Sequence, residues 1–282
     1  MRPMTGPEVV GSYSETGGVT KSATAVSLAV AYAQEYPDQE VILGDLDPRA
    51  AATKWTGAQA QRDDKGGALD MTAILAADDV EGWADEIAVS LDPGKGWPAN
   101  LRVIPSSRAL SAQEKTPDDH AERRLRRSLM GTRAGFVVLD FPNRQGGVLT
   151  QNGLTACTKV VYAARPDEDG LDGVDGAKLT VRKFHAYREE AGLSRLPHEV
   201  GIILGAAYTG AVWTRDALRA VEEFERTSPG MLLTPYIQHR VIVKECRSAG
   251  EFYAQYGGSA GGDKVFAAYR ELLLNRILDD RS

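Results

Sequence analysis

The stretch that decides the fold is Gly11-Ser12-Tyr13-Ser14-Glu15-Thr16-Gly17-Gly18-Val19-Thr20-Lys21-Ser22. It follows an apolar run over 8–13 that predicts a strand, and it opens a helical pattern over 22–35. Glycines let backbone N–H groups approach phosphate oxygens, and the free N–H groups at a helix start attract anions. Lys21 would place an ammonium on the β- and γ-phosphates, and Ser22 would offer a hydroxyl to Mg²⁺. The stretch therefore predicts a phosphate-binding loop.

The loop departs from the strict pattern G-x-x-x-x-G-K-[ST], because Glu15 and Thr20 stand at its two glycine positions. Taken alone, the stretch also fits a simple Gly-Gly turn before a helix. Two later strand ends favour the phosphate-binding interpretation. The run Val41–Asp45 is followed closely by Asp47, and the run Phe136–Asp140 ends in a carboxylate. Ligands of open α/β sheets bind at the carboxyl ends of strands, where an aspartate can support Mg²⁺.

Short apolar runs alternate with longer helical patterns along the rest of the chain. Continuous runs of this kind suit strands that are buried on both faces, and intervening helices imply a parallel sheet. The expected strands are Glu8–Tyr13, Val41–Asp45, Leu101–Pro105, Phe136–Asp140, Lys159–Ala163, Val200–Leu204 and Met231–Thr234, and the expected helices are Ser22–Glu35, Leu69–Ala77, Asp169–Ala191, Thr214–Glu225 and Lys264–Leu278. The expected fold is α/β, with a mostly parallel twisted sheet and helices on both faces. We expect one domain over 1–282, elaborated at about 55–100.

The amino-acid composition and net charge exclude several classes of protein. The 282 residues are 43% hydrophobic and 26% charged, which excludes a disordered chain. The net charge of −6 excludes a polybasic coat for nucleic acid, so any DNA contact needs a local patch. Two cysteines cannot form a disulfide framework. No signal peptide or membrane-spanning run is evident, and we expect a cytoplasmic protein.

With these motifs in place, the chain resembles the ParA/MinD group of deviant-Walker P-loop ATPases, and most closely the ParA plasmid and chromosome partition proteins. The stretch 16–22 lies on the family's KGGxxK[ST] loop, 45–49 on its DLDPQ segment and 138–142 on its Walker-B segment IIDTPP. Further similar segments are Val103–Ser106, Thr150–Val161, Glu245 and Ala267–Leu272.

The resemblance implies a protein that binds ATP with Mg²⁺, dimerises around the nucleotides and binds DNA without sequence preference. A ParB-type centromere-binding partner would stimulate hydrolysis, and the protein would associate with the nucleoid. Lys21 and Asp47 would be catalytic, with Asp47 orienting the attacking water. The metal would be supported by Ser22, Asp45 and Asp140. The nucleotide would contact Thr16, Gly17, Gly18, Val19, Thr20, Lys21, Ser22 and Ala23.

Two positions depart from the family pattern. The lysine that reaches into the partner's site falls on Thr16, which cannot supply a charge. By analogy with arginine fingers, losing such a charge lowers the rate by on the order of 10³-fold. Thr20 replaces the glycine before the Walker lysine, where a Cβ crowds the backbone. We therefore predict weak or partner-dependent hydrolysis. Arg49 could replace the lost charge.

Candidate DNA contacts are local. Arg240, Lys244 and Arg247 lie in the region that resembles the ParA C-terminal DNA-binding surface, and they would contact phosphates only. A second group precedes the Walker-B strand and is more typical of a solvated helix face; it comprises Arg123, Arg124, Arg126, Arg127 and Arg133.

Three alternatives stay open. The first is a ParA-like scaffold or regulator that binds nucleotide or DNA but hydrolyses little. The second is a MinD-like positioning protein, because the segment 272–280 is apolar enough to raise the question of a membrane helix, although it ends in two aspartates. The third is a remote iron–sulfur reductase, for which Cys157 and Cys246 lack the expected spacing.

Overall fold

The centre of the molecule is an eight-stranded sheet. A computed structural model describes residues 6–18, 20–115, 120–209 and 212–279. The strand order is β10-β9-β8-β1-β7-β2-β6-β5, and only the β5–β6 pairing is antiparallel. The strands are β1 (Glu8–Tyr13), β2 (Glu40–Asp45), β5 (Val89–Ser90), β6 (Leu101–Ile104), β7 (Ala134–Asp140), β8 (Lys159–Ala164), β9 (His198–Leu204) and β10 (Leu232–Leu233). The expected α/β fold of P-loop NTPase type, with a mostly parallel sheet, is confirmed.

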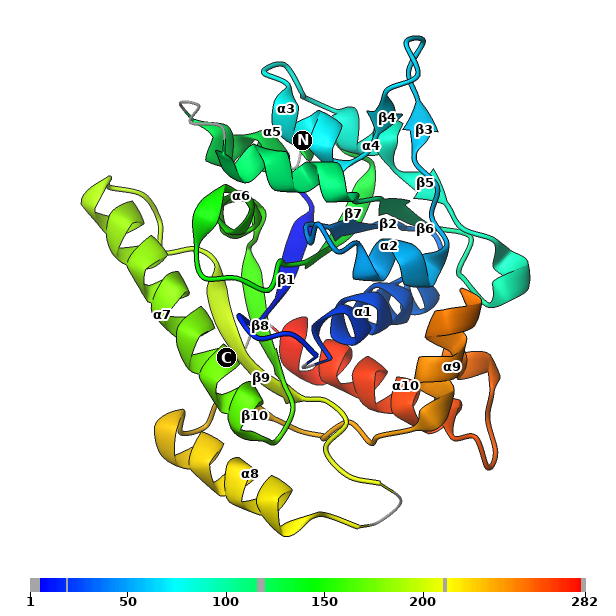
Figure 1. Cartoon of the computed structure of the whole chain (residues 1–282), viewed down its shortest axis with the longest axis vertical. Coiled ribbons are helices and arrows are strands. Elements are labelled where there is room, and N and C mark those ends of the chain that lie inside the picture. Colours follow the sequence, from blue (N-terminus) through cyan, green and yellow to red (C-terminus); the bar gives the residue numbers. More distant parts are fainter. Residues whose placement is uncertain (1–5, 19, 116–119, 210–211, 280–282) are drawn as a thin grey trace.

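Helices cover both faces of this sheet (Figure 1). One face carries α1 (Lys21–Glu35), α2 (Ala51–Thr56), α9 (Val241–Ala249) and α10 (Gly262–Leu272). The other carries α3 (Met71–Ala76), α4 (Trp83–Ile87), α5 (Arg124–Ser128), α6 (Gly147–Ala156), α7 (Glu168–Glu190) and α8 (Arg215–Thr227). The sheet is therefore the middle of three layers.

Each central strand contributes side chains to two separate cores, one on each face. Along β7, Phe136 and Val138 enter the core under α1, while Val137 and Leu139 enter the core under α6. All four are fully buried. Because strand side chains alternate between faces, a strand covered on both sides has to be apolar throughout. This is why the strands read as continuous runs, and burying each such side chain contributes about 1.5–3 kcal/mol.

The long helices lie within two residues of their expected starts, whereas several short elements were missed. The elaborated region holds a hairpin of β3 (Gln61–Arg62) and β4 (Ala68–Leu69), followed by α3 and α4. The side chain of Asp70 caps α3 by accepting a 2.8 Å hydrogen bond from the Thr72 N–H. The sequence predicted the α3 helix, but it predicted none of α2, α4, α5, α6 and α9, which have five to ten residues each.

The apolar C-terminal segment packs inward. After α10 the chain continues as a π-helical turn over Leu273–Ile277, and Leu272, Leu273 and Ile277 are fully buried against the sheet. Within the part of the chain that is described, no helix combines the length and apolar character needed to cross a bilayer. The two cysteines belong to the cores on opposite faces, Cys157 beneath α6 and Cys246 on α9. They therefore cannot share an iron–sulfur cluster.

The register of the sheet brings three strand ends together. β7 lies between β1 and β2, and Asp140 is paired with Ser12 on one side and with Asp45 on the other. Because these strands are parallel, the segments that follow them all leave at the same edge of the sheet. The glycine-rich loop after β1 therefore meets the aspartates that end β2 and β7, at the edge where open α/β sheets bind ligands.

Candidate functional site

The loop between β1 and α1 presents an uncapped helix start. Ser12 Oγ donates to the backbone oxygen of Lys21 at 3.0 Å, which ties the strand to the first helical residue. No side chain caps the first turn of α1, and no acidic residue lies in it. Its N–H groups are therefore available to an anion. Gly18 has φ +84°, a left-handed conformation that suits glycine, while Val19 lies outside the described residues.

Thr20, immediately before α1, is held in a left-handed conformation with φ 68° and ψ 8°. This region is strained for a β-branched residue. The Thr20 hydroxyl is buried and makes no hydrogen bond with any residue that the structure describes. The glycine that the resemblance places here would avoid both costs, so the crowding expected at this position has a backbone cause.

The ammonium group of Lys21 lies between two buried carboxylates. Its Nζ is 3.5 Å from Asp140 Oδ1 and 3.9 Å from Asp47 Oδ2, and all three side chains are almost fully buried. Neither carboxylate oxygen of Asp140 accepts a hydrogen bond. Burial raises the pKa of Asp140, although the nearby Lys21 charge opposes the shift. A buried carboxylate that is ion-paired with Lys21 but accepts no well-directed hydrogen bond from a described residue suits a hydrated cation or the water bound to it.

Within the described residues, no group of three histidine, cysteine, aspartate or glutamate side chains could hold a metal ion alone. An Mg²⁺ ion here would therefore need phosphate oxygens, the Ser22 hydroxyl and water as its other ligands. This is the usual situation of Mg²⁺ in nucleotide sites. The Asp140 oxygens, which accept no hydrogen bond from a described residue, and the uncapped start of α1 both fit that arrangement.

Asp45 holds the surrounding backbone in place. Its Oδ1 accepts a 3.0 Å hydrogen bond from the Asp47 N–H, and its Oδ2 accepts from the Thr53 N–H at 2.9 Å and from Thr53 Oγ1 at 2.8 Å. Burial and the neighbouring Asp140 charge raise the pKa of Asp45 to about 7, against the lowering effect of these donors. Both oxygens are thus engaged in positioning Asp47 and α2, in contrast to the free oxygens of Asp140.

This network gives a stability prediction. Thr53 Oγ1 donates to Asp45 and accepts from the Ser106 N–H at 2.9 Å. Thr53→Val therefore leaves the buried Ser106 N–H unpaired and removes one of the two hydrogen bonds that Asp45 Oδ2 accepts. We expect the free energy of unfolding to fall by about 2–3 kcal/mol. The matched control is Thr56→Val on the same helix, because the Thr56 hydroxyl bonds only backbone oxygens of α2. Denaturant unfolding of both variants measures the difference, and equal losses would contradict the role of the network.

Thr16 is directed toward α7. A Cβ on Gly173 would lie 2.8 Å from Thr16 Oγ1 and 2.9 Å from Thr16 Cβ, so the helix approaches the loop closely at this glycine. The neighbouring Glu15 is bound to the same helix, because its Oε1 accepts from Thr180 Oγ1 at 2.6 Å and its N–H donates to the Gly173 oxygen at 3.1 Å. The first half of the loop therefore packs against α7.

A pocket of about 470 Å³ opens in front of the second half of the loop. Besides Gly18, Thr20, Lys21, Ser22, Ala23 and Asp47, it is lined by Arg49, Lys54, Asn143, Ala206 and several residues of 237–247. The sequence did not single out Asn143, although it stands three residues after Asp140 and so shares that strand end. The segment 237–243 carries no motif, and its place depends on the path of the chain after β10.

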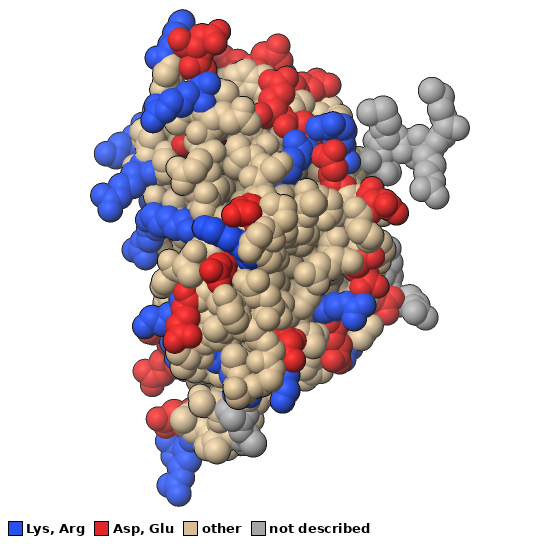
Figure 2. All heavy atoms as spheres, turned by 90° about the vertical axis from the view of Figure 1, so that its right-hand side faces the viewer, with Lys and Arg blue, Asp and Glu red and all other residues tan. Residues whose placement is uncertain are grey.

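The three residues predicted to bind DNA border this same pocket. Arg240 precedes α9, and the exposed Lys244 and Arg247 lie three residues apart on one face of it. Figure 2 shows Lys and Arg side chains gathered along one edge of the face that carries α9 and α10. The other arginine group has internal partners: Arg124 pairs with Asp78, Arg127 with Asp79, and Arg133 with Glu40 and Asp85. Three members of that group are thus engaged with the protein's own acidic residues.

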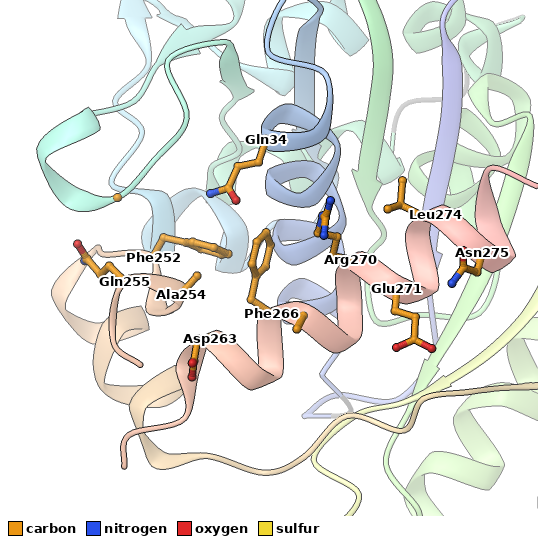
Figure 3. Close-up of a pocket in the computed structure, with 12 residues that line it drawn as sticks. Gln34, Phe252, Ala254, Gln255, Asp263, Phe266, Arg270, Glu271, Leu274 and Asn275 are labelled. Carbon is orange, nitrogen blue, oxygen red and sulfur yellow. The ribbon is translucent and has the colours of Figure 1, made fainter. Parts of the chain in front are cut away.

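A second hollow of about 680 Å³ lies between α1 and α10 (Figure 3). Arg270 in its wall is already paired with Glu35 on α1, through a 2.9 Å hydrogen bond from Nε. The walls also carry Asp263 and Glu271. Among its described lining residues this hollow offers no uncommitted cation to a phosphate, and it is remote from the loop.

The structure combines a mostly parallel sheet with a glycine-rich loop after a central strand, a buried lysine at the start of the next helix and two aspartates near strand ends. These features define a protein of the P-loop NTPase class. The family described as AAA domain (AAA_31) matches residues 8–191. The chain belongs to this family, and within it to the ParA/Soj type of P-loop ATPases.

Two curated relatives support this placement. The chain is 25% identical over 264 residues to the chromosome-partitioning ATPase Soj of Thermus thermophilus, and the match covers 94% of each chain. It is 28% identical over 179 residues to the sporulation initiation inhibitor protein Soj of Bacillus subtilis. That match covers 62% of this chain and 65% of the relative.

Solved structures share the fold. Apo McdA of Cyanothece has a TM-score of 0.75 at 18% identity, covering 94% of this chain and 99% of its own. A Borrelia burgdorferi plasmid partition protein bound to AMPPNP has a TM-score of 0.70 at 20% identity, with coverage of 95% and 98%. The cobyrinic acid a,c-diamide synthase of Mycobacterium smegmatis, with an ATP analogue and magnesium, has a TM-score of 0.69 at 22% identity, with coverage of 95% and 93%.

Proposed function

We propose that this chain is an ATP-dependent switch of DNA partition, of plasmid or chromosome, which binds ATP with Mg²⁺ and dimerises in that state. The observation that carries the proposal is the burial of Lys21 between Asp47 and Asp140 at an uncapped helix start. Such a cation, fixed beside free backbone donors, is suited to polyanionic phosphates. Family membership and the nucleotides in the named structural neighbours support the same proposal.

The chain's own residues divide the work of the site. The backbone of Gly17 and Gly18 and the start of α1 would cradle the phosphates, and the Lys21 ammonium would contact them. Ser22 and Asp140 would hold the metal, with Asp45 supporting it through the backbone that it fixes. Asp47 Oδ1 accepts from the Arg49 N–H at 2.8 Å, and Asp47 Oδ2, which lies 3.9 Å from Lys21 Nζ, would orient water. When bound, Mg²⁺ would offset the negative charge that develops on the phosphates.

Slow hydrolysis is part of the proposal. The Thr16 side chain carries no charge and lies against α7. Without a cation from position 16 or a substitute for it at the terminal phosphate, the rate is expected to be lower by on the order of 10³-fold than in a site that has one. A ParB-type partner and DNA would accelerate the reaction and release the dimer from the nucleoid. The one-domain organisation and a cytoplasmic location belong to this proposal as well.

Nucleotide-dependent size tests the switch. We expect the purified protein to elute as a dimer with Mg–ATP and as a monomer with Mg–ADP, and to bind a fluorescent ATP analogue. Turnover should be well below the typical enzyme range of about 1–10³ s⁻¹ without DNA or partner. Failure to bind adenine nucleotide with magnesium would overturn the proposal, and fast unassisted turnover would overturn the claim of slow hydrolysis.

DNA binding is proposed to use the cations beside the pocket, Arg240, Lys244 and Arg247. We expect Lys244→Ala with Arg247→Ala to weaken binding of random-sequence DNA by about 10-fold or more, since each lost phosphate contact removes a charge-assisted bond. The slope of log affinity against log salt should fall by about 2, one unit for each lost cation. Fluorescence anisotropy over a salt series measures both. Flat salt dependence of the unmodified protein would exclude phosphate contacts.

The second candidate function is that of a ParA-like scaffold, which would have the same fold and bind nucleotide or DNA but would not hydrolyse ATP. Thr16 and the strained Thr20 favour it, because both depart from the loop of an efficient ATPase. Dimerisation by ATP without any turnover, even with DNA present, would select this candidate. A MinD-like membrane role has less support, since Leu272, Leu273 and Ile277 are buried in the core.

A further inference from the structure

The nucleotide site lacks the positive charge that the ParA family pattern places at position 16 of the loop. Thr16 supplies none, and its side chain packs against Gly173 of α7. Thr16 is also absent from the pocket wall, which begins at Gly18. Lys21 is the only cation within the described part of the loop, and it already faces two carboxylates. A triphosphate bound here would therefore need a second cation from another segment.

Arg49 lies close to Gly17, the residue after Thr16. A Cβ built on Gly17 would lie 3.5 Å from Arg49 Nη1, which puts the guanidinium against the loop backbone. The side chain is exposed, lines the pocket and makes no salt bridge with any described residue. Its backbone is fixed at both polar groups, because the N–H donates to Asp47 Oδ1 at 2.8 Å and the oxygen accepts from Lys54 Nζ at 2.7 Å.

Two other cations of the pocket are held by different partners. The Lys54 ammonium donates a hydrogen bond to the Arg49 backbone oxygen, and Arg240 Nε donates to Gln238 at 2.8 Å. Lys244 and Arg247 belong to α9, and neither is among the atoms nearest to the loop glycines Gly17 and Gly18. Arg49 thus combines contact with the glycine loop, a fixed backbone and an uncommitted guanidinium.

We infer that Arg49 supplies, within the same chain, the positive charge at the terminal phosphate that position 16 lacks. The inference rests on the proposed function. A guanidinium presents two parallel N–H donors to phosphate oxygens, which a lysine cannot do. During hydrolysis the oxygen of water forms a bond to the terminal phosphorus, the bond from that phosphorus to the ADP oxygen breaks, and the proton of water passes to solvent. Arg49 keeps its own protons and stabilises the charge on the transferring group.

The test compares the affinity of two probes, Mg–ADP and Mg–ADP with aluminium fluoride, which imitates the transferring phosphoryl group. We expect Arg49→Ala to weaken the aluminium fluoride complex by about 100-fold, with the affinity for Mg–ADP changed less than about 3-fold. Arg49→Lys should fall between, because it keeps the charge and loses the fork. The control is Arg219→Ala, which removes an arginine that is 78% exposed on α8 and paired only within that helix.

The outcomes separate this inference from the proposed function. If the unmodified protein binds no Mg–ATP, the proposed function fails. If it binds Mg–ATP but Arg49→Ala weakens both probes equally or neither, the assignment of Arg49 is overturned while the proposed function stands. An aluminium fluoride complex no tighter than Mg–ADP in the unmodified protein would also overturn the assignment. None of these readouts requires turnover, so slow hydrolysis does not obscure them.

Discussion

Lys21→Met is expected to weaken Mg–ATP binding by about 100-fold, as the loss of about 3 kcal/mol from one charge-assisted contact implies. The same change should lower the free energy of unfolding by about 3–5 kcal/mol, because it breaks a buried ion pair. The reason is geometric: Asp140 and Asp47 are both buried and lie 3.5 Å and 3.9 Å from this ammonium. Without it, two carboxylates remain close together with no cation between them.

A double variant separates stability from binding. In Lys21→Met with Asp140→Asn, the unpaired buried carboxylate is removed together with the cation. We expect it to recover about half or more of the lost stability, since uncompensated buried charge is the main cost. Mg–ATP binding should stay weakened by about 100-fold or more, because no ammonium is restored. Denaturant unfolding and titration with a fluorescent ATP analogue give the two quantities. An unchanged unfolding free energy for the single variant would contradict the ion-pair interpretation.

The sequence predicted the parts of the site that depend on strand ends. Asp140 and Asp47 follow buried apolar runs, and parallel strands must release their carboxyl ends at one edge of the sheet. Their meeting with Lys21 also requires β7 to lie between β1 and β2, which the structure shows and the order of elements along the chain does not fix. The strands themselves are predictable because burial on both faces leaves no polar position, as β7 shows.

Other features of the site depend on packing, which the pattern of one chain does not contain. Asp45 was expected to support the metal, yet its oxygens bind Thr53 and the Asp47 backbone. Thr53 stands on α2, a helix of six residues that is too short to show helical periodicity. The direction of Thr16 toward α7 is equally invisible, because it follows from a close approach at Gly173. Sequence spacing located the charges but not the bonds that they make.

The left-handed conformation at Thr20 gives the second large effect. Thr20→Gly should raise the free energy of unfolding by about 1 kcal/mol, because a strain of about 1–2 kcal/mol is relieved against about 0.5–1 kcal/mol of chain entropy. The buried hydroxyl without a partner adds to the gain. The control Thr20→Ala removes the hydroxyl but keeps the Cβ, so it should recover only part of the effect. Equal stability of the alanine and glycine variants would exclude backbone strain as the cause.

Gly205, at the end of β9, makes this test stronger. A Cβ at Gly205 would overlap Thr20 Oγ1 and would lie 2.6 Å from Thr20 Cβ and 2.8 Å from Thr20 Cγ2, so no rotation of the threonine avoids it. Gly205 is not among the glycines with positive φ, so alanine there strains no backbone by itself. We expect Gly205→Ala to lower the free energy of unfolding by about 3 kcal/mol when Thr20 is present, which is the upper end of the usual range for overpacking. In the Thr20→Gly background the clashing atoms are gone, and the cost should fall below about 1 kcal/mol. The coupling of about 2 kcal/mol is measured by a double-mutant cycle in denaturant, and additive effects would show that Thr20 and Gly205 do not touch.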